Sequence, residues 1–116
     1  MKHKSDLVFL EHILDCIEAI EEFSKNITKK ELVSNRLKRS AIVREIEIIG
    51  EAVKNISQSL KDKHKEIEWK DIAGTRDKMI HHYFGVDVII ILDIIKKDLP
   101  VLKEQIQKIR KSLGEN

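Results

Sequence analysis

Residues 86–109 decide the fold class, and they read VDVIIILDIIKKDLPVLKEQIQKI. In isolation the β-branched run at the start of this stretch, residues 86–91, has the composition of a strand. The apolar residues that follow recur instead at the spacing of a helix, and they are Leu92, Ile95, Leu99, Leu102, Ile106 and Ile109. We therefore expect a helix from Asp87 to about Leu113 that Pro100 kinks or interrupts.

Two segments nearer the N-terminus predict long amphipathic helices. The first covers residues 5–23 and the second residues 36–59, and both carry apolar side chains at helical spacing. Gly50 lies inside the second helix, where glycine costs about 1 kcal/mol of helix propensity, and such a residue usually lets another backbone approach closely. Thr28, with Glu31 three residues later, has the form of a capping box and predicts a short extra helical turn between the two helices.

The remaining helical segment is shorter. It runs from near Trp69 to His82, with a kink expected at Gly74, and it follows a polar connection at residues 61–70. Four helices joined by short connections predict an all-α, antiparallel four-helix bundle that forms one domain over residues 1–116. An all-β fold is excluded because 4 Gly and 1 Pro cannot supply its frequent turns.

Composition narrows the class of protein without identifying a partner. The 22 Lys and Arg nearly balance the 20 Asp and Glu, which neither favours nor excludes nucleic acid. Cys16 is the one cysteine and lies on an apolar stripe, so we expect a buried small side chain rather than a reactive thiol. No segment has the pattern of a signal peptide or of a membrane span, and we expect a cytoplasmic protein.

The chemically distinctive stretch is residues 75–87, TRDKMIHHYFGVD. It combines a permanent cation, a carboxylate, two imidazoles and a phenol, which are Arg76, Asp77, His81, His82 and Tyr83. A helix end that carries His and a packed Tyr would also account for the cluster. Because neighbouring His side chains project about 100° apart on a helix, and no Cys or Glu stands at a chelating spacing, no metal site is predicted. The isolated glycines predict no phosphate-binding loop, and no cofactor is expected.

Helical spacing constrains how these groups cooperate. Asp77 and His81 are four residues apart and would share a helix face, where the carboxylate can orient the imidazole. Arg76 and His81 are five apart and would diverge by about 140°. They would still meet if the long Arg side chain swings round, if the helix ends near His81, or if the site combines two chains. We favour the two-chain explanation, which makes activity depend on dimerisation. Glu47 and Glu51 are candidates to contact Arg76, although solvated charges are the default interpretation.

Four segments together carry a family resemblance. The most specific is Arg76, four residues, His81, one residue and Tyr83, running on into FGVD at residues 84–87. The others are REIEIIGEA at residues 44–52, EIEWKDIAG at residues 66–74 and DLPVL at residues 98–102. In this order they resemble the HEPN superfamily, and within it the HepT-type toxins that are encoded beside MNT nucleotidyltransferase antitoxins. The first segment is similar to the family's Arg-x4-His-x-Tyr signature.

The resemblance implies a metal-independent endoribonuclease, the toxin of a type II or type VII-like toxin–antitoxin module, with Arg76 and His81 as its active-site pair. RNA supplies its own nucleophile, the 2′-hydroxyl, so that cleavage needs only proton transfer and a cation that stabilises the phosphorane. A homodimer would bring a second His as the partner acid. RNA is the implied substrate, with transfer RNA as a family-level expectation.

Two positions need separate comment. Tyr83 resembles the tyrosine that the MNT partner modifies with AMP, and the alternative interpretation is a packed aromatic residue. Asp77 stands where these toxins often have Asn, and its negative charge is expected to weaken RNA binding. His82 is interpreted as an exposed neighbour. The alternative function is a non-catalytic helical subunit that binds nucleotide or a partner enzyme within a nucleotidyltransferase complex.

Overall fold

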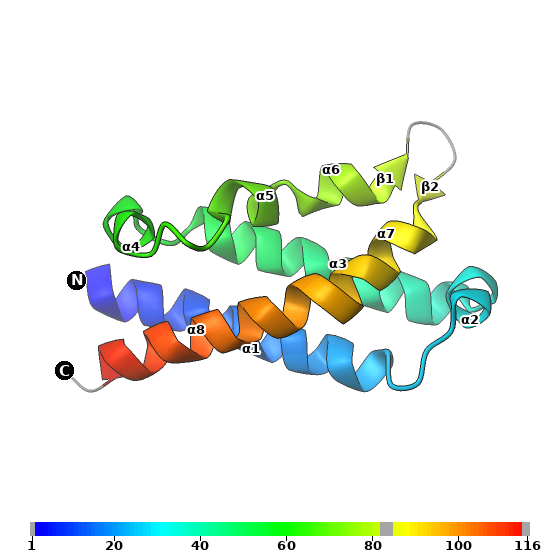
Figure 1. Ribbon diagram of the computed structural model, residues 1–116, viewed down its shortest axis with the longest axis horizontal. Coiled ribbons are helices and arrows are strands. Elements are labelled where there is room, and N and C mark those ends of the chain that lie inside the picture. Colours follow the sequence, from blue (N-terminus) through cyan, green and yellow to red (C-terminus); the bar gives the residue numbers. More distant parts are fainter. Residues whose placement is uncertain (1, 82–84, 115–116) are drawn as a thin grey trace.

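Three long helices form the frame of the molecule, and α1 packs against both of the others (Figure 1). They are α1 (Lys2–Phe23), α3 (Arg36–Lys54) and α8 (Leu99–Gly114). The computed structural model describes the backbone of residues 2–81 and 85–114, and the side chains of residues 5–79 and 87–114.

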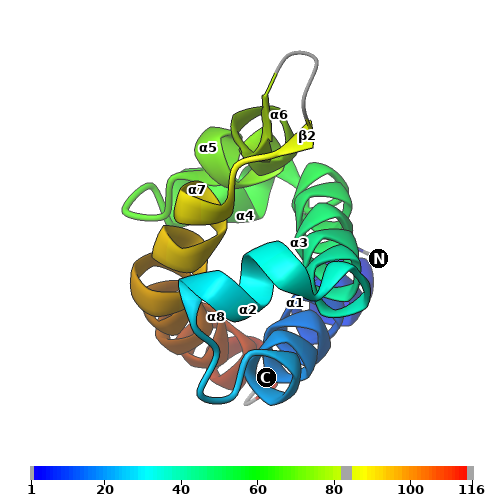
Figure 2. The ribbon, with the colours of Figure 1, turned by 90° about the vertical axis from the view of Figure 1, so that its right-hand side faces the viewer.

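Shorter elements complete the chain. The helical ones are α2 (Lys29–Ser34), α4 (Gln58–Lys63), α5 (Trp69–Ala73), α6 (Thr75–Met79) and α7 (Val88–Asp93). A π-helical turn, η1 (Ile94–Asp98), joins α7 to α8, and the two-residue strands β1 (Ile80–His81) and β2 (Gly85–Val86) pair antiparallel. Viewed end on, α5 and α6 lie between α3 on one side and α7 on the other (Figure 2). The predicted all-α four-helix bundle is therefore confirmed, with α5–α6 as the third member and α7–η1–α8 as the fourth.

One apolar core holds the bundle together. Its fully buried side chains come from α2 and from all four members of the bundle. The largest of them are Leu10, Ile13, Ile17, Ile20, Leu32, Ile42, Ile49, Met79, Ile91 and Ile106. Cys16 belongs to the same core with 6% of its surface exposed, as the sequence predicts. The short extra helix is also confirmed, because the Thr28 side chain accepts a hydrogen bond from the Glu31 amide at 3.1 Å and caps α2.

The second long helix ends earlier than expected. We predicted a helix over residues 36–59, but α3 ends at Lys54 and the separate α4 begins at Gln58. The first helix, expected from residue 5, begins earlier, at Lys2, so that Asp6 lies one turn inside α1. Asp6 is the tertiary cause of the break. Its buried carboxylate accepts hydrogen bonds from the Ser57 amide at 2.8 Å and the Ser57 hydroxyl at 2.7 Å. Ser57 is thereby held in extended backbone, where its side chain caps α4.

The fourth helix follows the prediction at its start and deviates in the middle. Asp87 caps α7 with its Oδ1, which accepts from the amides of Ile89 at 3.0 Å and Ile90 at 3.2 Å. The expected interruption near Pro100 is η1, where the Leu99 amide bonds to the Ile94 carbonyl five residues earlier. Because Pro100 has no N–H, it cannot continue the regular helical bonding pattern at this point.

Candidate functional site

Arg76 lies on α6, whose position is set by its junction with α5. The Thr75 hydroxyl donates to the carbonyls of Asp71 and Ile72, both at 2.9 Å, and takes acceptors that a continuous helix would have used for backbone bonds. Gly74 donates its amide to Lys70 at 3.0 Å and ends α5. The kink expected at Gly74 is thus a break between two helices of five residues each.

The junction sits close to α3 because of Gly50. A Cβ atom at Gly50 would lie 3.2 Å from the Ala73 carbonyl oxygen and 3.4 Å from the Ile72 carbonyl oxygen. The close backbone approach predicted for this glycine is therefore confirmed, and α5 is its partner. This packing brings α6 alongside the middle of α3, where Glu47 lies.

The Arg76 guanidinium is anchored to α3 by one ion pair. Its Nε donates to Glu47 Oε2 at 2.7 Å, with 61% of the Arg76 side chain and 24% of the Glu47 side chain exposed. Among the described residues the terminal amino groups of Arg76 make no further hydrogen bond or ion pair. Glu51, one turn further along α3, pairs instead with Lys54 at 3.4 Å. Of the two sequence candidates, Glu47 contacts Arg76 and Glu51 is a surface charge.

His81 lies in β1, after the helix has ended. Met79 is the last residue of α6, and its carbonyl accepts a short hydrogen bond, 2.6 Å, from the amide of Asp87. That bond closes the base of the β1–β2 pair, in which His81 stands opposite Gly85, and it takes the acceptor that a longer helix would need. The predicted helix over residues 69–82 is thus wrong at its C-terminal end. The shared helix face expected for Asp77 and His81 no longer applies, since the chain is extended at His81.

The described residues include some of the predicted site residues and not others. The Asp77 side chain is exposed, and no hydrogen bond or ion pair of its carboxylate occurs among the described side chains. The side chain of His81 and the residues His82 and Tyr83 lie outside the described part of the structure. Of the three explanations for Arg76 and His81, an early helix end agrees with the backbone, and the two-chain site stays a prediction.

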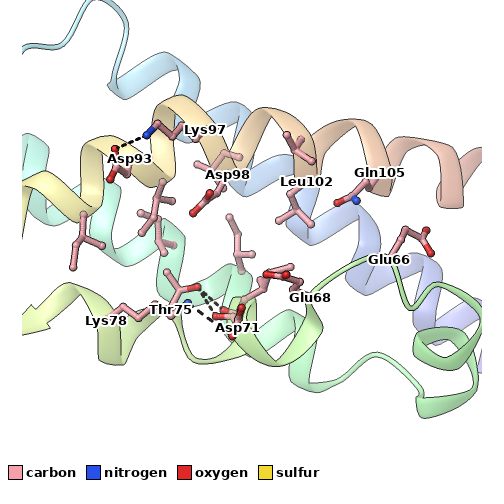
Figure 3. Close-up of a pocket in the computed structure, with 17 residues that line it drawn as sticks. Glu66, Glu68, Asp71, Thr75, Lys78, Asp93, Lys97, Asp98, Leu102 and Gln105 are labelled. Carbon is pink, nitrogen blue, oxygen red and sulfur yellow. Dashed lines mark hydrogen bonds and ion pairs between the residues drawn. The ribbon is translucent and has the colours of Figure 1, made fainter.

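A groove of about 670 Å³ opens on the other side of α6 (Figure 3). Apolar side chains of α3, α5, η1 and α8 form its floor, and its charged residues are Glu66, Glu68, Asp71, Asp93, Asp98, Lys78 and Lys97. Lys78 pairs with Asp71 at 3.9 Å and Lys97 with Asp93 at 3.6 Å, so both cations are compensated within the groove. Five carboxylates against two lysines make this groove acidic, and it repels a nucleic-acid backbone. Periodicity gave no signal for it, because its residues come from three separate stretches of the chain, 46–49, 66–78 and 90–105.

The groove and Arg76 lie on different flanks of α6. Thr75 and Lys78 line the groove, whereas Arg76 projects about 100° away from Thr75 and lies against α3. An anionic ligand of Arg76 would therefore approach from the α3 side, away from the carboxylates.

Two other kinds of site are absent from the described residues. No group of three or more His, Cys, Asp or Glu side chains within residues 5–79 and 87–114 is arranged to hold a metal ion. Within the same described part of the chain, no helix combines the length and apolarity that crossing a bilayer requires.

Comparison with known proteins gives the family. The family model described as "Ribonuclease HepT-like" matches residues 13–109, which include Glu47, Arg76 and His81. The chain belongs to the HepT-like ribonuclease family. The resemblance seen in the four sequence segments is therefore confirmed for the HepT-like fold and family.

Several curated relatives of this HepT-like chain carry ribonuclease names. "Probable ribonuclease HepT" of Thermococcus cleftensis is 45% identical over 103 residues, which cover 89% of this chain and 94% of that protein. A "Putative RNase" of Caldanaerobacter subterraneus subsp. tengcongensis is 44% identical over 106 residues, 91% of this chain and 95% of the relative. "Gamma-glutamylcyclotransferase and putative RNase" of Methanocaldococcus jannaschii is 43% identical over 109 residues, 94% of this chain. The HepT-like chain spans about half, 49%, of the length of that last protein. No solved structure matches the chain.

Proposed function

We propose that this HepT-like chain is a metal-independent endoribonuclease in which Arg76 binds the scissile phosphate and His81 transfers a proton. The observation that carries the proposal is the Arg76 guanidinium, exposed and tethered on the flank away from the acidic groove, in a chain of a ribonuclease family. A permanent cation whose terminal amino groups make no hydrogen bond to a described residue is well suited to bind phosphate. The motif begins with Arg76 in α6 and reaches His81 in β1, so it spans the end of a helix and a strand.

The proposed chemistry uses these two side chains, a second acid and the 2′-hydroxyl of the RNA. His81 accepts the proton of the 2′-hydroxyl, whose oxygen attacks the adjacent phosphorus. The bond from phosphorus to the 5′-oxygen then breaks, and the leaving oxygen takes a proton from a second acid. The products are a 2′,3′-cyclic phosphate and a 5′-hydroxyl. Arg76 stabilises the additional negative charge on the phosphorane oxygens.

A homodimer supplies the second acid in this proposal. Two copies of the motif facing each other place one His as base and the other as acid, which a single chain with one motif histidine does not provide. The same proposal includes the toxin role. A cognate MNT-type nucleotidyltransferase neutralises the protein when the Tyr83 hydroxyl attacks the α-phosphorus of ATP and pyrophosphate leaves. The bulky anion left on Tyr83 repels RNA from the cleft.

The test is cleavage of total cellular RNA by the purified protein in excess EDTA. We expect fragments with 2′,3′-cyclic phosphate ends, and we expect Arg76→Ala and His81→Ala each to lower the rate by at least about 100-fold. Circular dichroism and light scattering serve as controls, and both variants should keep the fold and oligomeric state of the wild type. Undiminished cleavage by both variants would refute the assignment of the site. An unmodified wild-type protein that cleaves no RNA would refute the enzyme and leave the non-catalytic binding subunit.

A further inference from the structure

We propose that Glu47 is a positioning residue, which orients the Arg76 guanidinium for phosphate from the neighbouring helix. This inference rests on the proposed ribonuclease function and deepens it. The Nε of Arg76 donates to Glu47 Oε2 at 2.7 Å across 29 residues of sequence, so that the contact is tertiary and not a consequence of helical spacing.

The need for such a residue follows from where Arg76 lies. Its helix α6 has five residues, and 61% of the Arg76 side chain is exposed, so the packing around it does not restrict the several rotatable bonds of the side chain. Glu47 stands in the middle of the 19-residue α3 and is 24% exposed, which makes it the better-ordered partner. A surface ion pair contributes only about 0–1 kcal/mol to stability. The contact therefore matters for direction more than for folding.

The direction is specific because a guanidinium has two edges that can bind an anion by two hydrogen bonds. One edge uses Nε and one terminal amino group, and the other uses both terminal amino groups. Glu47 occupies Nε and so blocks the first edge. No described residue occupies the second edge, which is therefore the one we propose for phosphate. Glu47 thus selects end-on binding of the scissile phosphate and fixes the plane in which its oxygens must lie.

Glu51 provides a matched control on the same helix. It carries the same charge one turn along α3, its side chain is 70% exposed, and it pairs with Lys54 rather than with Arg76. Removing either carboxylate takes one negative charge from the same flank and should favour RNA binding to a similar extent. Only removal of Glu47 releases the guanidinium.

The kinetic experiment measures kcat and KM for an RNA oligonucleotide in EDTA. We expect Glu47→Ala to lower kcat by about 10- to 100-fold, because misplacement of a reacting group by about 1 Å has an effect of this size. Its KM should stay unchanged or fall. Glu47→Gln keeps an oxygen that accepts from Nε and should recover most of kcat, whereas Glu51→Ala should keep the wild-type kcat. Equal kcat values for Glu47→Ala and Glu51→Ala would overturn the positioning role.

A second measurement is independent of activity. The Arg76 side-chain Nε–H, assigned by its loss in Arg76→Lys, is followed by nuclear magnetic resonance as it exchanges with solvent. We expect slow exchange in the wild type and Glu51→Ala, and fast exchange in Glu47→Ala. Fast exchange in the wild type would overturn the tether whether or not RNA is cleaved. Slow exchange in a wild-type protein that cleaves no RNA would instead refute the proposed function, and with it the catalytic purpose of the tether.

Discussion

At the scale of single residues, the carboxylates of Asp6 and Glu47 each bind a residue that is distant in the sequence. Asp6 is 5% exposed and holds Ser57, 51 residues away, through two hydrogen bonds. Glu47 holds Arg76 across 29 residues with a more exposed contact. A buried carboxylate destabilises the fold unless hydrogen bonds satisfy it. A partly exposed carboxylate such as Glu47 adds little to stability, and its contact can instead orient the partner side chain. Asp6 thus stabilises the fold, whereas Glu47, in our proposal, orients the Arg76 side chain.

Among the described residues, Cys16 is the one whose ionisation the fold clearly changes. Burial raises the pKa of its thiol from 9.0 to about 11, and the negative charge of Glu45 adds to the effect. The folded state therefore favours the neutral thiol. Stabilisation from this group is complete below pH 9 and is lost as the pH rises towards 11.

Two measurements check this prediction for Cys16. The native thiol should react with iodoacetamide at pH 8 far more slowly than the thiol of urea-unfolded protein, because the thiolate is the nucleophile and the site is buried. The free energy of unfolding should also fall more between pH 8.5 and pH 10.5 in the wild type than in Cys16→Ala, which lacks this titration; the packing lost in the variant lowers its stability at every pH. Equal losses in the two proteins would contradict the raised pKa.

At the scale of elements, the site depends on how helices end. α5 and α6 are separated by the Thr75 hydroxyl bonds, and α6 ends where the Met79 carbonyl turns to Asp87. Both events place Arg76 on a short helix and His81 on the strand that follows. The candidate site thus lies at a change of secondary structure, where the backbone can present Arg76 and His81 in directions that one continuous helix does not allow.

The packing of α5 on α3 predicts the effect of Gly50→Ala. Alanine gains about 1 kcal/mol of helix propensity, but its Cβ would meet the Ala73 carbonyl oxygen at 3.2 Å, and overpacking against rigid backbone costs about 1–3 kcal/mol. We expect a net destabilisation of about 1 kcal/mol in urea unfolding, together with slower RNA cleavage as α6 shifts.

Gly114→Ala is the control for this experiment. A Cβ at Gly114, the last residue of α8, would meet nothing within 4 Å among the described atoms, so its unfolding free energy and cleavage rate should stay close to those of the wild type. A Gly50→Ala protein as stable as the Gly114→Ala protein would show that α3 and α5 separate without cost.

At the scale of the whole molecule, the acidic groove and Arg76 occupy different flanks of α6. The groove between α5–α6 and α7–η1–α8 carries five carboxylates and two lysines, and Arg76 lies beside α3, where Glu47 pairs with it. The overall balance of 22 basic and 20 acidic residues gives no sign of the acidic groove. We expect RNA to cross the Arg76 flank and to avoid the groove, since phosphates are repelled there.

Subunit mixing tests whether two chains share one site. Wild-type and His81→Ala proteins are unfolded together, refolded and assayed for RNA cleavage in EDTA. A site that takes its base from one chain and its acid from the other has a single His in the mixed dimer, so the activity per wild-type chain should fall as the variant is added in excess. An activity per wild-type chain that stays constant in confirmed mixed dimers would place a complete site within each chain.

What the sequence by itself determined is the set of local features. The apolar period established the helices and their burial, the Thr28 and Asp87 caps located two helix starts, and the four motif segments identified the HepT-like family. These features depend on residues within about one or two helical turns of each other, or on residue identity alone, and a pattern read along the chain contains them.

Only the tertiary structure decided where helices stop and what Arg76 touches. The break before α4 comes from Asp6, the end of α6 from the Asp87 amide, and the guanidinium direction from Glu47. Each of these three hydrogen bonds joins residues that helical spacing does not bring together. The groups that form them could also bond to other partners nearby along the chain. Packing of the distant element therefore decides which partner is used.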